Sequence, residues 1–222
     1  MKRLRVTQRV LSGNDVAAAA LRSRFAEHGI LVLNLLSSPG SGKTSLLERT
    51  AVALRGRVRM AVIEGDLQTE RDAERVRCAG VQAVQINTDG GCHLSADMVA
   101  GVLPQFDLTA LDVLFIENVG NLVCPASFDL GEDAAVLLFS VTEGDDKPGK
   151  YPTAFLKADV VVVNKTDLTA YTNFNLERFR QDMTKIKSTL PLLTVSCTQG
   201  VGLETWYAWL DERLRAKKGL PS

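Results

Sequence analysis

The chain has 222 residues, 45% of them hydrophobic, and its 26 basic side chains balance its 26 acidic ones. A net charge of zero argues against charge-driven binding of nucleic acid or of an anionic membrane surface. The longest apolar run (30–36) is too short to cross a bilayer, no secretion signal is predicted, and four scattered cysteines form no disulfide framework, so we expect a cytoplasmic protein with reduced thiols.

A first helix is predicted within residues 12–29, with Ser12, Asn14 or Asp15 as its N-cap and Gly29 after its last turn. Short runs rich in valine and isoleucine then predict strands that are buried on both faces, as in parallel sheets, at 30–36, 58–63, 81–86, 113–116, 135–141, 160–163 and 192–195. Helices are predicted between several of these strands, at 44–54, 69–79, 175–189 and 203–216.

This alternation of strands and helices predicts an α/β fold with a doubly wound, mostly parallel sheet that carries helices on both faces. We expect residues 1–29 to form an N-terminal helical extension, 30–217 the main domain and 218–222 a C-terminal tail. Ligands of open α/β sheets bind beyond the carboxyl ends of the strands, so functional motifs are expected at that edge.

The segment SSPGSGKTS (37–45) lies between a predicted strand and a predicted helix, which is the setting of a phosphate-binding loop. Gly40 and Gly42 let the backbone turn its N–H groups toward phosphate oxygens, and Lys43 would place a cation beside the β- and γ-phosphates. The hydroxyl of Thr44 would bind Mg²⁺. The residues predicted to bind nucleotide in this loop are Ser38, Pro39, Gly40, Ser41, Gly42, Lys43, Thr44 and Ser45.

The tetrapeptide NKTD, which begins at Asn164 after the run VVVV, indicates a guanine-binding loop. The carboxylate of Asp167 can accept hydrogen bonds from N1 and the 2-amino group of guanine, a donor pair that adenine lacks. Asn164 would brace the loop, and the stem of Lys165 would cover one face of the base. In the next strand-end loop, VSCTQG, a backbone N–H near Ser196 and Cys197 could reach guanine O6. We therefore predict that the nucleotide is GTP or GDP rather than ATP.

Acidic residues at two further strand ends are candidates for catalysis. Glu64 and Asp66 end the second predicted strand, and Glu117 ends the fourth, with Gly120 three residues later. Asp66 is the first candidate for binding Mg²⁺ or positioning water, with Lys43 and Glu117 as the other catalytic candidates. Glu64 and Glu117 could equally be solvated strand ends or helix caps. No glutamine or arginine finger is recognisable, so hydrolysis is expected to be slow until dimerisation or a partner assists it.

Cys92 and His93 follow the third predicted strand and Cys124 follows the fourth, so their loops leave the same edge of a parallel sheet. Thiolate and imidazole ligands suit Zn²⁺ or Ni²⁺. Three ligands leave such a site incomplete, and water, substrate or a second subunit related by a two-fold axis would complete it. A buried cysteine and a capping histidine explain the same spacing equally well. Cys78 and Cys197 are expected to be small apolar fillers.

Five stretches of the sequence resemble the HypB family, the nickel-inserting GTPases of NiFe-hydrogenase maturation: LNLLSSPGSGKTSLLE, IEGDLQT, TDGGCHLSADM, FIENVGNLVCPASFDLGE and VVVNKTDL. The resemblance implies a P-loop fold of the SIMIBI class, with a GTPase domain at 30–217 and a homodimer that forms with GTP. It implies that Cys92, His93 and Cys124 bind Ni²⁺ or Zn²⁺ at the dimer interface. It also implies two partners, a HypA-like nickel chaperone and the large-subunit precursor of a NiFe-hydrogenase.

Many members of that family carry an N-terminal histidine tract or a CxxCGC motif that binds nickel tightly. The first 30 residues of this chain contain one histidine, His28, and no cysteine, so the resemblance implies nickel binding at the interface site alone. Both metal loops follow strand ends that also carry nucleotide sensors. Exchange of GTP for GDP is therefore expected to shift Cys124 and weaken the metal site.

Two other interpretations stay open at this point. The chain could be a P-loop kinase for a small molecule, whose lid would be the loop at 143–152. It could also be a dimer linked by zinc, in which nucleotide only rigidifies the fold. Within the candidate lid, KPGK is expected to be a solvated turn, although Lys147 could bind nucleotide across a dimer.

Overall fold

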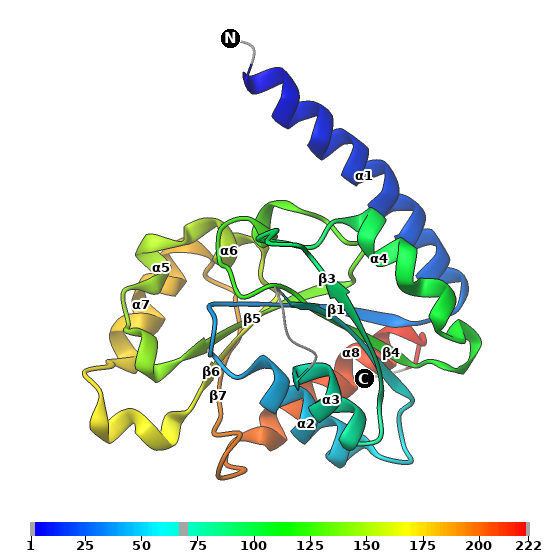
Figure 1. Cartoon of the computed structure of the whole chain (residues 1–222). Coiled ribbons are helices and arrows are strands. Elements are labelled where there is room, and N and C mark those ends of the chain that lie inside the picture. Colours follow the sequence, from blue (N-terminus) through cyan, green and yellow to red (C-terminus); the bar gives the residue numbers. More distant parts are fainter. Residues whose placement is uncertain (1–2, 67–70, 221–222) are drawn as a thin grey trace.

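The computed structural model describes the backbone of residues 3–66 and 71–220 and the side chains of residues 13–65 and 74–220. The described strands form one seven-stranded sheet in the order β3-β2-β4-β1-β5-β6-β7 (Figure 1). Every neighbouring pair of these strands is parallel. The prediction of an α/β fold built on a mostly parallel sheet is confirmed.

All of the predicted strands are present, with ends that move by a few residues at most. The sequences of these strands are nearly continuous apolar runs because helices cover both faces of the sheet. Every residue of the four central strands β4, β1, β5 and β6 is buried. The strands are β1 (Leu31–Ser37), β2 (Met60–Asp66), β3 (Gln82–Asn87), β4 (Val113–Glu117), β5 (Ala134–Ser140), β6 (Val160–Asn164) and β7 (Leu192–Thr194).

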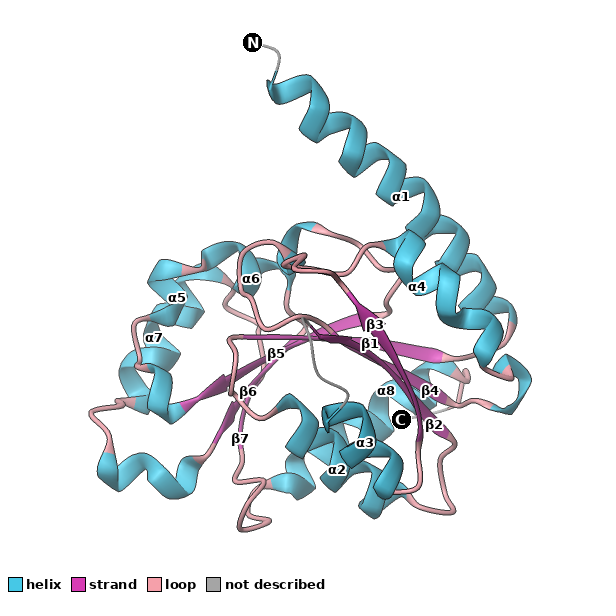
Figure 2. Ribbon diagram, in the orientation of Figure 1, coloured by secondary structure: helices cyan, strands magenta, loops and turns pink. Residues whose placement is uncertain are grey.

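The helices pack on both faces of the sheet (Figure 2). One face is covered by α2 (Lys43–Leu54), α3 (Arg71–Cys78) and α8 (Leu203–Lys217). The other face is covered by α1 (Arg3–Glu27), α4 (Ala96–Val102), α6 (Pro152–Lys157) and α7 (Leu176–Ile186). Of the helices that the structure describes, none combines the length and the apolar character needed to cross a membrane.

The first helix begins earlier than predicted. Because α1 starts at Arg3, the three candidate N-caps Ser12, Asn14 and Asp15 lie inside the helix, and that prediction is wrong. Gly29, at φ +64°, follows the end of the helix as predicted. Figure 1 shows the N-terminal half of α1 extending away from the sheet. Its C-terminal half packs into the core through Ala18, Leu21 and Phe25.

Asn14 caps a different helix from the one predicted. Its side chain is buried, and its Oδ1 accepts a hydrogen bond at 2.9 Å from the N–H of Ala96, the first residue of α4. Its Nδ2 donates to the carbonyl of Asp129 at 2.8 Å. The polar side chain therefore satisfies backbone groups of two distant segments instead of a group at the start of its own helix.

The segment 143–152 is packed against the domain only in part, because Pro148 is buried whereas Gly149, Lys150 and Pro152 are exposed. Residues Lys147–Lys150 form one helical turn, α5, in which Pro148 is buried. Nζ of Lys147 lies 3.8 Å from Oε2 of Glu143 and 5.5 Å from the ring centroid of Tyr151. The prediction of a solvated turn is therefore wrong for Pro148, whose side chain is packed, and correct for Gly149 and Lys150, which are exposed.

Replacing Asn14 by alanine should lower the free energy of unfolding by about 2 kcal/mol, because the N–H of Ala96 and the carbonyl of Asp129 lose their buried partner. Urea unfolding followed by circular dichroism measures this difference. The control is Asp15→Ala, on an exposed position of the same helix, which should leave the stability within about 0.5 kcal/mol of the parent. Equal stabilities of the two variants would contradict the capping role.

Candidate functional site

The loop after β1 has the backbone conformation of a phosphate-binding loop. Gly40 at φ +75° and Gly42 at φ +99° lie in the left-handed region that favours glycine. α2 begins directly afterwards at Lys43, so the unpaired N–H groups and the positive end of the helix dipole face this loop. A Cβ on Gly42 would lie only 2.4 Å from Nδ2 of Asn164, so glycine is required here for space as well as conformation.

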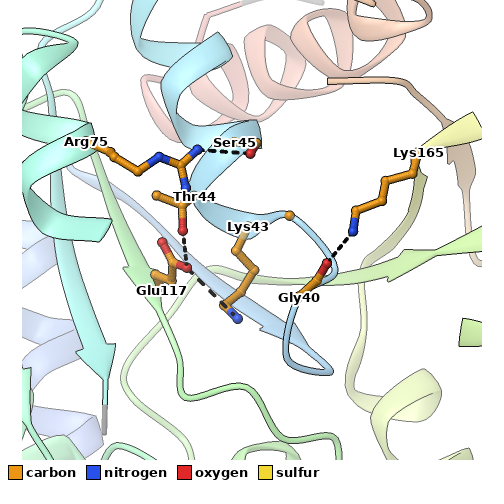
Figure 3. A pocket seen from close by; sticks show the side chains of 8 residues that line it. Gly40, Lys43, Thr44, Ser45, Arg75, Glu117 and Lys165 are labelled. Atoms are coloured by element: carbon orange, nitrogen blue, oxygen red, sulfur yellow. Dashed lines mark hydrogen bonds and ion pairs between the residues drawn. The ribbon is translucent and has the colours of Figure 1, made fainter. Parts of the chain in front are cut away.

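A cavity of about 260 Å³ opens above this loop (Figure 3). At its wall, Oγ1 of Thr44 donates a hydrogen bond at 3.0 Å to Oε1 of Glu117, and Nζ of Lys43 lies 4.0 Å from the same oxygen. Nζ of Lys43 also donates to Oγ of Ser37 at 2.9 Å. The residues that line the cavity are Gly40, Gly42, Lys43, Thr44, Ser45, Arg75, Glu117 and Lys165.

The carboxylate of Glu117 and the hydroxyl of Thr44 form an all-oxygen donor pair at the cavity wall. Both side chains are almost fully buried, and Glu117 is only 5% exposed. A carboxylate buried this deeply needs partners, and it has the hydroxyl of Thr44 and the ammonium group of Lys43. Oxygen donors of this kind are those that Mg²⁺ prefers, so the pair fits the ion that accompanies a nucleoside triphosphate.

Asn164 ties the loop after β6 to the phosphate-binding loop. Its Nδ2 donates to the carbonyl of Ser41 at 3.0 Å, while its Oδ1 accepts from the N–H groups of Lys165 at 2.7 Å and Cys197 at 3.1 Å. Lys165, at φ +60°, reaches back so that Nζ donates to the carbonyl of Gly40 at 2.7 Å. The two loops predicted to hold phosphate and base are therefore joined directly.

Asp167 and the strand-end loop after β7 also meet. Oγ of Ser196 donates to Oδ1 of Asp167 at 2.5 Å, which orients the carboxylate predicted to select guanine. The N–H of Cys197 is already bonded to Asn164, so the predicted contact with guanine O6 would need a neighbouring N–H of this loop. Burial raises the pKa of the Cys197 thiol to about 11, and this cysteine is a buried filler as predicted. Cys78 is exposed, so the same prediction for it is wrong.

Of the two acidic residues at the end of β2, Glu64 has a described side chain and Asp66 does not. Glu64 is 2% exposed and lies beside Glu117 in the register of the neighbouring strands, so it is not a solvated strand end. Asp66 is the last residue of β2, but its side chain lies outside the described residues. Its predicted roles in Mg²⁺ binding and in positioning water stay predictions.

The three candidate metal ligands lie together on the loops after β3 and β4. Cys92, His93 and Cys124 each offer one ligand atom, and these atoms lie within 4.8 Å of one another. A hydrogen bond with the Cys124 thiol raises the pKa of Cys92, and burial lowers the pKa of His93, which favours the neutral imidazole that binds metals. Two sulfurs and one imidazole nitrogen suit Ni²⁺ or Zn²⁺, while their role as ligands stays a prediction.

Two residues that the sequence did not single out support this Cys/His cluster. The ring of His93 stacks on Phe128 with a centroid distance of 3.8 Å. Nδ2 of Asn121 donates to the carbonyl of Cys92 at 3.3 Å. Both residues lie within a few positions of Cys124 in the sequence. Their spacing does not predict a contact with the loop of Cys92 and His93, which precedes them by about thirty residues.

The segment 117–124, which we call the linking segment, contacts both the phosphate-binding loop and the loop that carries the first two metal candidates. Asn118 is fully buried, and its Oδ1 accepts at 3.2 Å from the N–H of Leu94, the residue after the cluster's histidine. Gly120 packs so closely on the phosphate-binding loop that a Cβ there would lie 3.0 Å from the Cα of Pro39. One short segment therefore connects the cavity wall with the Cys/His cluster.

Comparison with known proteins identifies the family. Residues 31–194 match a family model described as the CobW/HypB/UreG nucleotide-binding domain. The hydrogenase maturation factor HypB of Azotobacter vinelandii is 50% identical over 218 residues, which span 96% of this chain and 72% of that protein. The chain belongs to the HypB family. The resemblance carried by its sequence motifs is thereby confirmed.

Solved HypB structures have the same fold. The crystal structure of HypB from Helicobacter pylori in complex with nickel superposes with a TM-score of 0.86 at 44% identity, covering 92% of this chain and 96% of that one. HypB from Archaeoglobus fulgidus superposes with a TM-score of 0.86 at 38% identity, covering 92% of this chain and all of that one. The prediction of a P-loop NTPase fold is confirmed, and the HypB nucleotide-binding domain contains both the cavity and the Cys/His cluster.

Replacing Gly42 by alanine should weaken both folding and nucleotide binding. The new Cβ would force a left-handed backbone on alanine, at a cost of about 1–2 kcal/mol, and would displace the side chain of Asn164. Gly101→Ala is the matched control, because Gly101 lies in α4 at a negative φ with open space around it. Thermal unfolding and titration with a fluorescent guanine nucleotide measure the two effects. Unchanged nucleotide affinity in Gly42→Ala would contradict the account of this loop.

Proposed function

We propose that this protein is a GTP-hydrolysing metallochaperone that delivers nickel to the large-subunit precursor of a NiFe-hydrogenase. Its HypB relatives from Azotobacter vinelandii and Escherichia coli are hydrogenase maturation factors that are each 50% identical to it, and the HypB of Helicobacter pylori has been crystallised with nickel. The observation that carries the proposal is the linking segment, because it contacts the phosphate-binding loop and the Cys/His cluster at once.

The cavity supplies the groups that binding of GTP or GDP requires. Lys43 extends into it as a cation for the β- and γ-phosphates, and the backbone at Gly40 and Gly42 turns its N–H groups toward the same space. Asp167, oriented by Ser196, would accept the two hydrogen bonds of guanine. The contacts of Asn164 hold the phosphate and base loops at a fixed separation, so the whole nucleotide is positioned by one rigid edge of the sheet.

The hydroxyl of Thr44 and the carboxylate of Glu117 would hold Mg²⁺, and Asp66 is proposed as a further carboxylate for it. When bound, Mg²⁺ supplies positive charge to the β- and γ-phosphate oxygens. Lys43, Asp66 and Glu117 are the proposed catalytic residues. Lys43 stabilises charge on the phosphates, whereas Asp66 orients the attacking water and Glu117 holds Thr44 in place. Slow intrinsic turnover follows from the lack of a recognised arginine or glutamine finger in the sequence.

Nickel is the cargo of the proposed Cys/His site. Cys92, His93 and Cys124 provide three ligands, and the same residues of a second subunit would complete the site across a two-fold axis. Zn²⁺ suits the same ligands and is the alternative occupant of the resting protein. A GTP-dependent homodimer would therefore form the nickel site, receive nickel from a HypA-like chaperone and release it toward the hydrogenase precursor in the cytoplasm.

GTP hydrolysis should occur without any added phosphate acceptor, which distinguishes a GTPase from a P-loop kinase.

Asp167→Asn should lower the affinity for GTP by about tenfold to a hundredfold and improve binding of xanthosine triphosphate, because an amide offers one acceptor and one donor where guanine needs two acceptors. Phosphate release and nucleotide titration measure these effects. Asp211→Asn, on α8 away from the cavity, is the control. Equal turnover of GTP and ATP by the parent protein would contradict the proposed specificity.

Cys124→Ala should weaken Ni²⁺ binding by at least about tenfold while GTP hydrolysis stays within about twofold, because the side chain contributes one of three ligands in each subunit but does not line the cavity. Cys78→Ala, which removes an exposed cysteine outside the cluster, is the matched control and should change neither property. Isothermal titration with NiSO₄ and a phosphate-release assay measure the two. Parallel loss of nickel binding and hydrolysis in Cys124→Ala would indicate a folding role for this cysteine.

A further inference from the structure

Arg75 on α3 reaches across to the first turns of α2 and lines the phosphate cavity (Figure 3). Its Nη2 lies 3.2 Å from Oγ of Ser45, the residue next to the proposed Mg²⁺ ligand Thr44. Two further hydrogen bonds join it to the carboxylate of Glu48, from Nη2 at 2.6 Å and from Nε at 3.1 Å. The arginine is therefore held at the cavity wall by a fork-shaped ion pair.

A purely structural explanation of this ion pair is weak. The side chain of Arg75 is 45% exposed and that of Glu48 is 31% exposed, and ion pairs in such surroundings contribute about 0–1 kcal/mol to stability. The two lysines of the cavity wall, in contrast, contact the phosphate-binding loop itself. Lys43 donates a hydrogen bond to Ser37, and Lys165 donates one to the carbonyl of Gly40. Glu48, one of the partners of Arg75, lies on α2 outside the loop, so an exchange of this partner for phosphate would leave the loop in place.

We propose that Arg75 is a phosphate-directed residue that acts within its own subunit, and that Glu48 restrains it until nucleotide fills the cavity. A guanidinium group binds phosphate oxygens through the same two-pronged geometry that it uses with a carboxylate. When a nucleoside triphosphate is bound, Arg75 leaves Glu48 and places its charge on the phosphates, where negative charge develops during transfer to water. This inference rests on the proposed nucleotide-dependent function. It adds the guanidinium group of Arg75, which no sequence motif marks, to the groups that stabilise charge on the phosphates.

The two partners of the ion pair should have opposite effects on hydrolysis. Arg75→Ala should lower the single-turnover rate of GTP hydrolysis by about tenfold or more, because charge stabilisation is lost in the transition state. Glu48→Gln should raise the rate or tighten binding of a non-hydrolysable GTP analogue by a few-fold, since the restraint on Arg75 is weakened. In the double variant the gain should vanish, because Glu48 acts only through Arg75.

The control is Arg77→Ala, on the same helix, which hydrogen-bonds the carbonyl of Ala83 and does not line the cavity; it should hydrolyse GTP at the parent rate. Arg75→Lys keeps the positive charge but loses the two-pronged hydrogen bonding. Its rate of GTP hydrolysis should lie between those of the parent and Arg75→Ala, so it still tests the proposal if the alanine variant unfolds. A structural ion pair predicts instead that Arg75→Ala and Glu48→Gln lower the rate equally, and that result overturns the assignment.

Failure of this inference can be told apart from failure of the proposed function. Parent-like hydrolysis in folded Arg75→Ala, with an active parent protein, overturns the role of Arg75 alone. A parent protein that does not hydrolyse GTP overturns the proposed function and this assignment together. Binding of GDP, which lacks the γ-phosphate, should change less in Arg75→Ala than binding of the GTP analogue; equal losses would place the arginine away from the γ-phosphate and contradict the proposal.

Discussion

The buried carboxylate of Glu117 is the constraint on which the rest of the site depends. It lies at the end of a central strand with 5% of its surface exposed, where an unpaired charge would be strongly destabilising. Its partners include Thr44 and Lys43, the two residues that we propose engage a bound nucleotide. A ligand of those two side chains would alter the surroundings of Glu117, and the proposed function requires the end of β4 to respond to whether the cavity is filled.

That response has a short path to the Cys/His cluster. The residue after Glu117, Asn118, binds the backbone N–H of Leu94 beside the cluster, and the linking segment itself ends at Cys124. Because Asn118 is buried and Gly120 packs closely on Pro39, a shift at the cavity wall would be passed to this segment. Coupling of this kind is reciprocal, so under the proposed function nickel would change the affinity for nucleotide by the same factor that nucleotide changes the affinity for nickel.

Features that depend on contiguous residues could be predicted from the sequence, and features that depend on contacts across the fold could not. The phosphate-binding loop and the strands follow from local patterns, such as the spacing of Gly40 and Gly42 and runs of valine. The local pattern predicts Asn14 as a cap of its own helix, whereas its partner Asp129 lies 115 residues away. The position of Arg75 beside α2 likewise depends on contacts that only the folded structure brings together. The resemblance to the HypB family implies a metal-binding role for the Cys/His pair, which spacing alone left open and which stays a prediction.

The central claim is that the nucleotide state controls the metal site through the linking segment. Its most direct test is the dissociation constant for Ni²⁺, measured together with the oligomeric mass, in the presence of GDP and of a non-hydrolysable GTP analogue. The account predicts a dimer with the analogue and a nickel affinity that differs between the two states by at least about fivefold, the lower end of typical coupling between sites. The same nickel affinity in both states would contradict it.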